Sequence, residues 1–200
     1  MKILVYDAGP LGTLFAARLG QGGHEVSLLP RGQRLADSRE HGLVLEVALT
    51  RVRTVTHLPI VERLDPDDAY DLIAVIMRKN RALEILPVLA ANRPTPNILF
   101  LMNNAAGPDE LVKAVGKERV LMGFPEGVGM FVEGYIARYP GGTEKRKGIL
   151  PIGEVEDCVT DRIQKIAAAL QLEDLVQSAC SQGEAGGVHP RIKLSTKQSA

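Results

Sequence analysis

The chain begins with Met1-Lys-Ile-Leu-Val-Tyr-Asp-Ala-Gly-Pro-Leu-Gly12, and this stretch decides the fold. It contains a short apolar run, Ile3 to Tyr6, which is typical of a buried strand in a parallel sheet. Apolar residues at helical spacing follow the glycines and predict a helix directly after them: Leu11, Leu14, Phe15 and Leu19. In such a unit, backbone N–H groups and the positive end of the helix dipole point at one place, which suits the pyrophosphate of a dinucleotide.

The turn between this strand and helix departs from the usual fingerprint G-x-G-x-x-G and reads D-x-G-x-x-G. Gly9 stands where the backbone must approach the pyrophosphate, and Gly12 lets the helix pack close to the strand. Asp7 replaces the first glycine, and its negative charge would lie near an anionic ligand. A degenerate motif of this kind also fits an ordinary strand-to-helix turn. Its context favours a cofactor turn made by Gly9, Pro10, Leu11 and Gly12.

The composition fits one globular domain, because 45% of the 200 residues are hydrophobic and 24% are charged. Since 24 basic residues balance 24 acidic ones, the net charge gives no argument for binding nucleic acid or an anionic membrane. No apolar run reaches the ~20 residues of a bilayer-spanning helix, and no signal peptide is evident. Cys158 and Cys180 lie far apart and fit reduced thiols, so we expect a cytoplasmic protein. The four histidines lack metal-ligand spacing, and no metal site is expected.

The second predicted strand, residues 24–29, leads into Leu29-Pro-Arg-Gly-Gln-Arg34. In the dinucleotide-binding fold, the end of this strand faces the ribose of the adenosine. An acidic residue there binds the 2′-hydroxyl of NAD, whereas an arginine accommodates the 2′-phosphate of NADP. Because this loop holds no carboxylate, NADP is the predicted cofactor, with Arg31 as the first candidate ligand of the 2′-phosphate and Arg34 as the second. Alternatively, both arginines are solvated loop charges.

Strands and helices alternate along residues 33–123. Patterns of apolar residues predict buried strands at 71–77, 97–102 and 119–123, and helices at 33–41, around 83–89 and from 108. Two further β-like runs, 43–49 and 52–58, predict a hairpin or an extended crossover. The alternation indicates an α/β fold with a Rossmann-like, doubly wound, mostly parallel sheet.

Beyond Gly123 the pattern predicts a C-terminal β-hairpin and a helix. The runs 129–139 and 147–154 flank the turn residues Pro140-Gly-Gly-Thr143, so we expect them to pair with each other. Residues 157–172 have the spacing of an amphipathic helix, and the stretch after them has no clear periodicity. We therefore expect an NADP-binding domain over residues 1–175 and an irregular or disordered tail over 176–200.

Several segments, in this order, are similar to one protein family. They are Lys2–Gly12, Leu28-Leu-Pro-Arg-Gly32, 71–78, Leu101-Met-Asn-Asn-Ala-Ala-Gly107, Arg119-Val-Leu-Met-Gly123, Glu133-Gly-Tyr-Ile-Ala-Arg-Tyr139 and Leu150-Pro-Ile-Gly-Glu154. Over about residues 1–172 the chain resembles the N-terminal NADP-binding domain of the ketopantoate reductase (2-dehydropantoate 2-reductase) family. The resemblance implies an oxidoreductase of pantothenate biosynthesis that reduces a small-molecule 2-oxo acid with NADPH.

The resemblance also implies roles for individual residues. Gly9 and Gly12 would face the pyrophosphate and Arg31 the 2′-phosphate. Arg78 stands where the family usually has a lysine near the cofactor. Asn104 stands where the family has an asparagine close to the nicotinamide and the substrate, although the glycine that follows it there is an alanine here. Alternatively, Asn104 caps the following helix or closes a turn.

Family members continue for roughly another 100 residues as a helical domain, a size that is ordinary for a domain. This domain supplies the catalytic lysine and the groups that hold the substrate, and we expect it to be absent from a chain that stops at Ala200. The segment Ile192-Lys-Leu194 faintly resembles the motif around the catalytic lysine, without its flanking aromatic residue. Lys193 is therefore a candidate catalytic residue beside Asn104, and the alternative is a solvated surface charge.

Three functions remain open from the sequence. The first is an NADPH-dependent 2-oxo acid reductase, in which the family's lysine protonates the developing alkoxide. The second is a non-catalytic nucleotide-binding or interaction module that has lost the substrate domain, and the third is a shortened or altered form of the enzyme. An incomplete helical domain would expose apolar surface, which favours self-association, for example as a homodimer.

Overall fold

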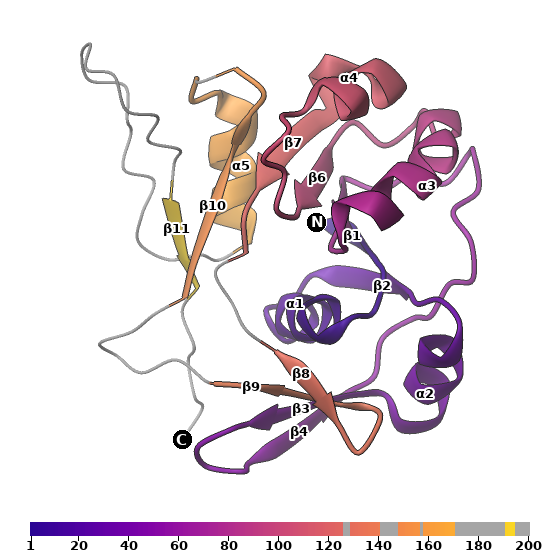
Figure 1. Cartoon of the computed structure of the whole chain (residues 1–200), viewed down its shortest axis with the longest axis vertical. Helices are drawn as coiled ribbons and strands as arrows, with labels where there is room; N and C mark the ends of the chain where they lie inside the picture. Colours follow the sequence, from indigo (N-terminus) through magenta and orange to yellow (C-terminus); the bar gives the residue numbers. More distant parts are fainter. Residues whose placement is uncertain (126–128, 141–147, 157, 171–190, 195–200) are drawn as a thin grey trace.

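A seven-stranded sheet forms the centre of this computed structural model, which describes residues 1–125, 129–140, 148–156, 158–170 and 191–194 (Figure 1). The strand order is β11-β10-β7-β6-β5-β1-β2. Five strands run parallel: β1 (Lys2–Tyr6), β2 (Glu25–Leu29), β5 (Leu72–Val75), β6 (Ile98–Leu101) and β7 (Val120–Gly123). The predicted Rossmann-like, mostly parallel sheet is confirmed.

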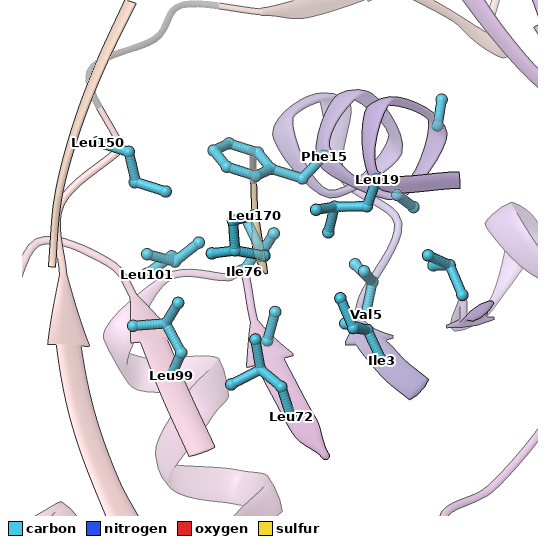
Figure 2. Packing of buried hydrophobic residues seen from close by; sticks show 14 of the residues in the cluster. Ile3, Val5, Phe15, Leu19, Leu72, Ile76, Leu99, Leu101, Leu150 and Leu170 are labelled. Atoms are coloured by element: carbon cyan, nitrogen blue, oxygen red, sulfur yellow. The ribbon is translucent and has the colours of Figure 1, made fainter. Parts of the chain in front are cut away.

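Helices cover both faces of this sheet, because successive strand residues point to opposite faces and are apolar on each. Ile3 and Val5 pack on one face with α1 (Pro10–Gln21) and α5 (Asp161–Ala169). Leu4 and Tyr6 pack on the other face with α3 (Lys79–Ala91) and α4 (Asp109–Val115). Figure 2 shows Phe15 and Leu19 of α1 directed at the side chains of the strands. None of the described helices is long and apolar enough to cross a bilayer.

A second, four-stranded sheet lies against the outer side of α1 (Figure 1). It contains the predicted hairpin of β3 (Leu43–Val47) and β4 (Arg53–Thr56), which follows α2 (Gln33–His41). The other two strands, β8 (Met130–Val132) and β9 (Ile136–Tyr139), form a hairpin of their own, and β9 pairs with β3 in parallel.

The predicted pairing between 129–139 and 147–154 is wrong. The first run folds on itself at Glu133 and Gly134, which both have positive φ, to give β8 and β9. The second run becomes β10 (Gly148–Glu154), which extends the main sheet by pairing antiparallel with β7. The sequence placed the turn at Pro140-Gly-Gly-Thr143 because these are typical turn residues, and beyond Pro140 this segment lies outside the described residues.

The C-terminal elements are shorter than predicted. The predicted helix at 157–172 is present as α5, and its N-cap Thr160 accepts a hydrogen bond from the Ile163 amide. Within the predicted tail, Arg191–Leu194 form β11, which pairs antiparallel with β10. The rest of the tail, Cys180 included, lies outside the described residues, while Cys158 is a free, exposed thiol.

One buried carboxylate holds the second sheet together. Glu46 on β3 is only 2% exposed, and Arg51, Arg53 and Arg138 surround it with nitrogen–oxygen distances of 3.2, 2.8 and 2.5 Å. Hydrogen bonds from Arg53 and Arg138 lower the pKa of Glu46 to about 2. The ionised form is therefore the one that links β3, β4 and β9.

The ion cluster around Glu46 should make the stability of the folded chain depend on pH. The pKa of Glu46 is lower in the folded chain than its ordinary value of 4.5, so the unfolded chain binds more protons between these values. The stabilisation by Glu46 is present above pH 4.5 and is lost as the pH falls toward 2. We expect Glu46→Gln to lower the Tm most at neutral pH, with a gap to the wild type that narrows in acid. Thermal melts between pH 7 and pH 3 check this, and a gap independent of pH would contradict it.

Candidate cofactor site

The turn after β1 presents backbone donors at the start of α1 that find no partner in the part of the chain that the structure describes. The first helical hydrogen bond runs from the Thr13 amide to the Gly9 carbonyl at 2.8 Å, so the amides of Leu11 and Gly12 precede it. Gly9 is the N-cap residue and has no side chain to accept from them, and Pro10 has no N–H. No acidic residue stands in the first turn of the helix. This end of α1 can therefore bind an anion.

The motif requires glycine at its two positions, Gly9 and Gly12, for different structural reasons. Among the described residues, a Cβ on Gly9 would meet no atom within 4 Å, so these residues leave the space in front of this backbone open. A Cβ on Gly12 would lie 2.2 Å from the Asp7 carbonyl oxygen, so any side chain there would force helix and strand apart. An open backbone approach and a close helix–strand contact are what a dinucleotide pyrophosphate requires, and the residues present fit it.

Asp7 keeps the glycine-like conformation of the turn although it is not glycine. Its φ is +83°, a value that aspartate and asparagine tolerate better than most residues. The Asp7 amide donates to the Leu29 carbonyl at 2.9 Å, which ties the end of β1 to the end of β2. The Asp7 backbone therefore keeps the shape of the turn, while its carboxylate stays beside the site.

Arg31 reaches from the end of β2 back across the sheet. Its Nε lies 3.5 Å from Oδ1 of Asp7, and its Nη2 lies 3.9 Å from Sδ of Met77, which follows β5. Because β2, β1 and β5 are neighbours in this order, the side chain crosses over the carboxyl end of β1. The Arg31 side chain is 34% exposed, and its guanidinium pairs with the Asp7 carboxylate.

Arg34, the second candidate for the 2′-phosphate, is engaged elsewhere. Its guanidinium lies 4.0 Å from the centre of the Phe131 ring, forms an ion pair with Asp37 at 3.2 Å and donates to the Gly134 carbonyl. These contacts tie α2 to the β8–β9 hairpin. They give Arg34 a structural task, and Arg31 stays the leading candidate.

Two more predicted residues follow the next strands at the same edge. Arg78 comes after β5, is exposed and is the N-cap residue of α3; it forms no ion pair with the residues that the structure describes. Asn104 comes after β6, and its Nδ2 donates to the Gly107 carbonyl at 2.6 Å. The N-cap residue of α4 is Pro108, so Asn104 closes a turn and does not cap the helix.

The amide oxygen of Asn104 is buried and has no hydrogen-bond partner within the described part of the chain. A buried acceptor without a partner is rare in a folded protein and calls for an explanation. The amide oxygens of Asn92 and Asn97 are likewise buried without a partner among the described residues, so what singles out Asn104 is its place after β6, where a ligand at this edge of the sheet could donate to it.

The predicted site residues lie at the point where the strand order of the sheet reverses. From β1 the chain proceeds outward to β2, and from β5 it proceeds the other way to β6 and β7. Ligands of open α/β sheets bind at this switch point, outside the carboxyl ends of the strands. Gly9, Arg31, Arg78 and Asn104 follow β1, β2, β5 and β6, so the structure brings these four to one edge.

Lys193 lies farther away along the sheet. It belongs to β11, and four strands stand between β11 and β1 in the sheet order. Its backbone pairs with Ile149 of β10, three residues before the partner of Gly123 at the carboxyl end of β7. The structure describes the backbone of Lys193, and its catalytic role stays a prediction.

Gly129 is a neighbour of the cofactor turn that could not be predicted from the sequence. A Cβ on Gly129 would lie 3.2 Å from Cβ of Pro10, so the segment entering β8 packs against the first residue of α1. Met130, next along the chain, is 60% exposed. The sequence signals a close contact only by the glycine itself, and this does not predict which residue packs against it.

Comparison with known proteins agrees with this architecture. A family model described as ketopantoate reductase PanE/ApbA matches residues 3–140. The chain belongs to the ketopantoate reductase family. The predicted resemblance is confirmed, and the matched part of the family is its N-terminal domain. No curated protein matches.

Several solved structures of reductases and dehydrogenases share the fold. A 2-dehydropantoate 2-reductase from Methylococcus capsulatus is 19% identical, with a TM-score of 0.70 over 86% of this chain and 54% of that one. The enzyme from Geobacter metallireducens is 22% identical, with a TM-score of 0.68 over 86% and 55%. A D-mandelate dehydrogenase in a ternary structure with NADH and anilino(oxo)acetate is 23% identical, with a TM-score of 0.73 over 86% and 54%. The chain thus spans about half the length of these proteins.

Proposed function

We propose that this chain binds NADPH at the start of α1 and acts in the reduction of a small 2-oxo acid. The observation that carries the proposal is the uncapped, open turn at Gly9, with Arg31, Arg78 and Asn104 at the same edge of the sheet. Family membership supports a nicotinamide cofactor and an oxidoreductase activity. With this activity the chain would serve pantothenate biosynthesis in the cytoplasm.

Each residue of the site has a task in this proposal. The amides of Leu11 and Gly12 bind the pyrophosphate, and Arg31 meets the 2′-phosphate. Arg78 adds positive charge beside the cofactor, and the Asn104 side chain orients substrate and nicotinamide through the acceptor that is otherwise unpartnered. The bound cofactor supplies a hydride to the carbonyl carbon. Lys193 is the proposed donor of the proton that the developing alkoxide takes up.

A reductase assay tests the proposal. The chain is mixed with NADPH and a series of 2-oxo acids that includes ketopantoate and an aromatic member, and loss of NADPH absorbance is followed. We expect turnover with at least one acid and a loss of about 10- to 100-fold in Asn104→Ala, since a positioned polar group contributes on this scale.

Asn97 is a matched control at the opposite end of the same strand, where its Nδ2 donates to the Asp71 carbonyl at 2.8 Å. Asn97→Ala should leave the rate unchanged. NADPH binding without turnover of any acid would favour a non-catalytic nucleotide-binding module, which the acidic Asp7 in the turn also favours.

A further inference from the structure

Asp7 is the one position where the cofactor turn departs from the glycine fingerprint, and its carboxylate contacts the proposed 2′-phosphate ligand. The backbone there has φ +83°, which glycine adopts freely and which other L-residues rarely adopt. The turn itself therefore needs no side chain at this position. The role of the Asp7 carboxylate must therefore be sought in its contact with Arg31.

The pair is fixed from both sides. The Asp7 amide donates to the Leu29 carbonyl at 2.9 Å, and the Asp7 side chain is 23% exposed. Arg31 extends over the carboxyl end of β1, with Nε 3.5 Å from Asp7 and Nη2 3.9 Å from Met77. The guanidinium is thus drawn inward over β1 and β5 instead of projecting from the end of β2.

The residue before Asp7 adds no charge to the pair. Tyr6, the last residue of β1, is 5% exposed, and burial raises the pKa of its phenol, so it stays neutral at neutral pH. Apolar and neutral groups beside a charge pair lower the local dielectric and reduce screening. Tyr6 therefore adds no charge beside Asp7 and Arg31, and both stand where they can respond to the charge that a ligand brings.

NADPH and NADH differ only by the 2′-phosphate, so the groups that lie near that position separate them, and charged groups act on the phosphate most strongly. Arg31 attracts this group, whereas Asp7 neutralises Arg31 and repels the same phosphate. Resting on the proposed function, we propose that Asp7 is a specificity-determining residue: its carboxylate, by pairing with Arg31, reduces the preference of the site for NADPH over NADH.

Titration of nicotinamide fluorescence tests this with the full chain. Dissociation constants for NADPH and for NADH are measured for the wild type, Asp7→Asn, Arg31→Ala and the double variant. Asparagine keeps the size of the side chain and tolerates the positive φ, so the variant should fold. We expect Asp7→Asn to shift the ratio of the two constants about tenfold toward NADPH. In the Arg31→Ala background, only the direct repulsion between Asp7 and the phosphate remains, so the same change should shift the ratio much less.

Asp71→Asn is the matched control, because Asp71 accepts from the Lys2 amide at 2.7 Å at the opposite end of β1. It should leave the ratio unchanged. Asp7→Gly, which relieves the backbone and removes the charge, should shift the ratio in the same direction as Asp7→Asn.

Each other outcome counts against the inference. An unchanged ratio in Asp7→Asn, or an equal shift with and without Arg31, would overturn it and leave the cofactor site standing. Absence of binding of either nucleotide to every variant would overturn the proposed function together with the inference.

Discussion

Gly12→Ala is expected to reduce nicotinamide dinucleotide binding by at least about 100-fold and to lower the free energy of unfolding by about 1–3 kcal/mol. The added Cβ would lie 2.2 Å from the Asp7 carbonyl oxygen, a backbone atom that no rotamer change can move. Helix α1 must therefore shift away from β1, and the amides of Leu11 and Gly12 move with it. Chemical denaturation and fluorescence titration measure the two effects.

Gly9→Ala is the matched control for this prediction. A Cβ on Gly9 meets no atom of the described residues within 4 Å, and its φ of −64° suits alanine. The methyl group enters only the open space in front of the turn, so binding should weaken while stability stays within about 0.5 kcal/mol of the wild type. Equal behaviour of the two variants would contradict the assignment of this space to the cofactor.

Arg31→Ala is expected to weaken NADPH binding by about 30-fold and NADH binding by no more than about threefold. Hydrogen bonds to a charged partner contribute roughly 1.5–3 kcal/mol, and NADH lacks the phosphate that receives them. The prediction is measured as two dissociation constants on the same preparation. Equal losses for both nucleotides would remove Arg31 from the 2′-phosphate.

Arg34→Ala is the matched control, because Arg34 lies on the Phe131 ring and pairs with Asp37. It should lower stability slightly and leave the preference between the nucleotides unchanged. A selective loss of NADPH binding in this variant would transfer the assignment to Arg34.

The strand, turn and helix at residues 2–21 could be predicted because their signals are local. A buried apolar run, two glycines and a helical repeat follow one another within this stretch. The loop after β2 was equally readable, since its position relative to the first strand is a property of the fold. The same holds for Asn104, whose strand and following helix are marked by composition.

Long-range pairing could not be predicted from the same signals. Residues 129–139 and 147–154 both read as strands, but nothing local says that β9 pairs with β3 and β10 with β7. Strand β11 has the alternation Arg191-Ile-Lys-Leu194, which is too short to stand out from an irregular stretch. Which partner a strand takes depends on the surface that the rest of the fold offers.

The contacts of Arg31 and Arg34 also could not be predicted from the sequence. Arg31 and Arg34 are three residues apart in one loop and helix start, and composition treats them alike. One turns inward to Asp7 and Met77, and the other turns to the β8–β9 hairpin, a hundred residues away in the chain. Only the folded arrangement separates a candidate ligand from a structural side chain.

Titration of the purified wild-type chain with NADPH and, separately, with NADH tests the central claim most directly. Nicotinamide fluorescence reports binding, and the account predicts saturable binding of both nucleotides, with a moderate preference for NADPH. It also predicts that Gly12→Ala loses this signal. If neither nucleotide changes the fluorescence at concentrations up to about 1 mM, where affinities of about −4 kcal/mol would still be seen, the turn at Gly9 is not a cofactor site.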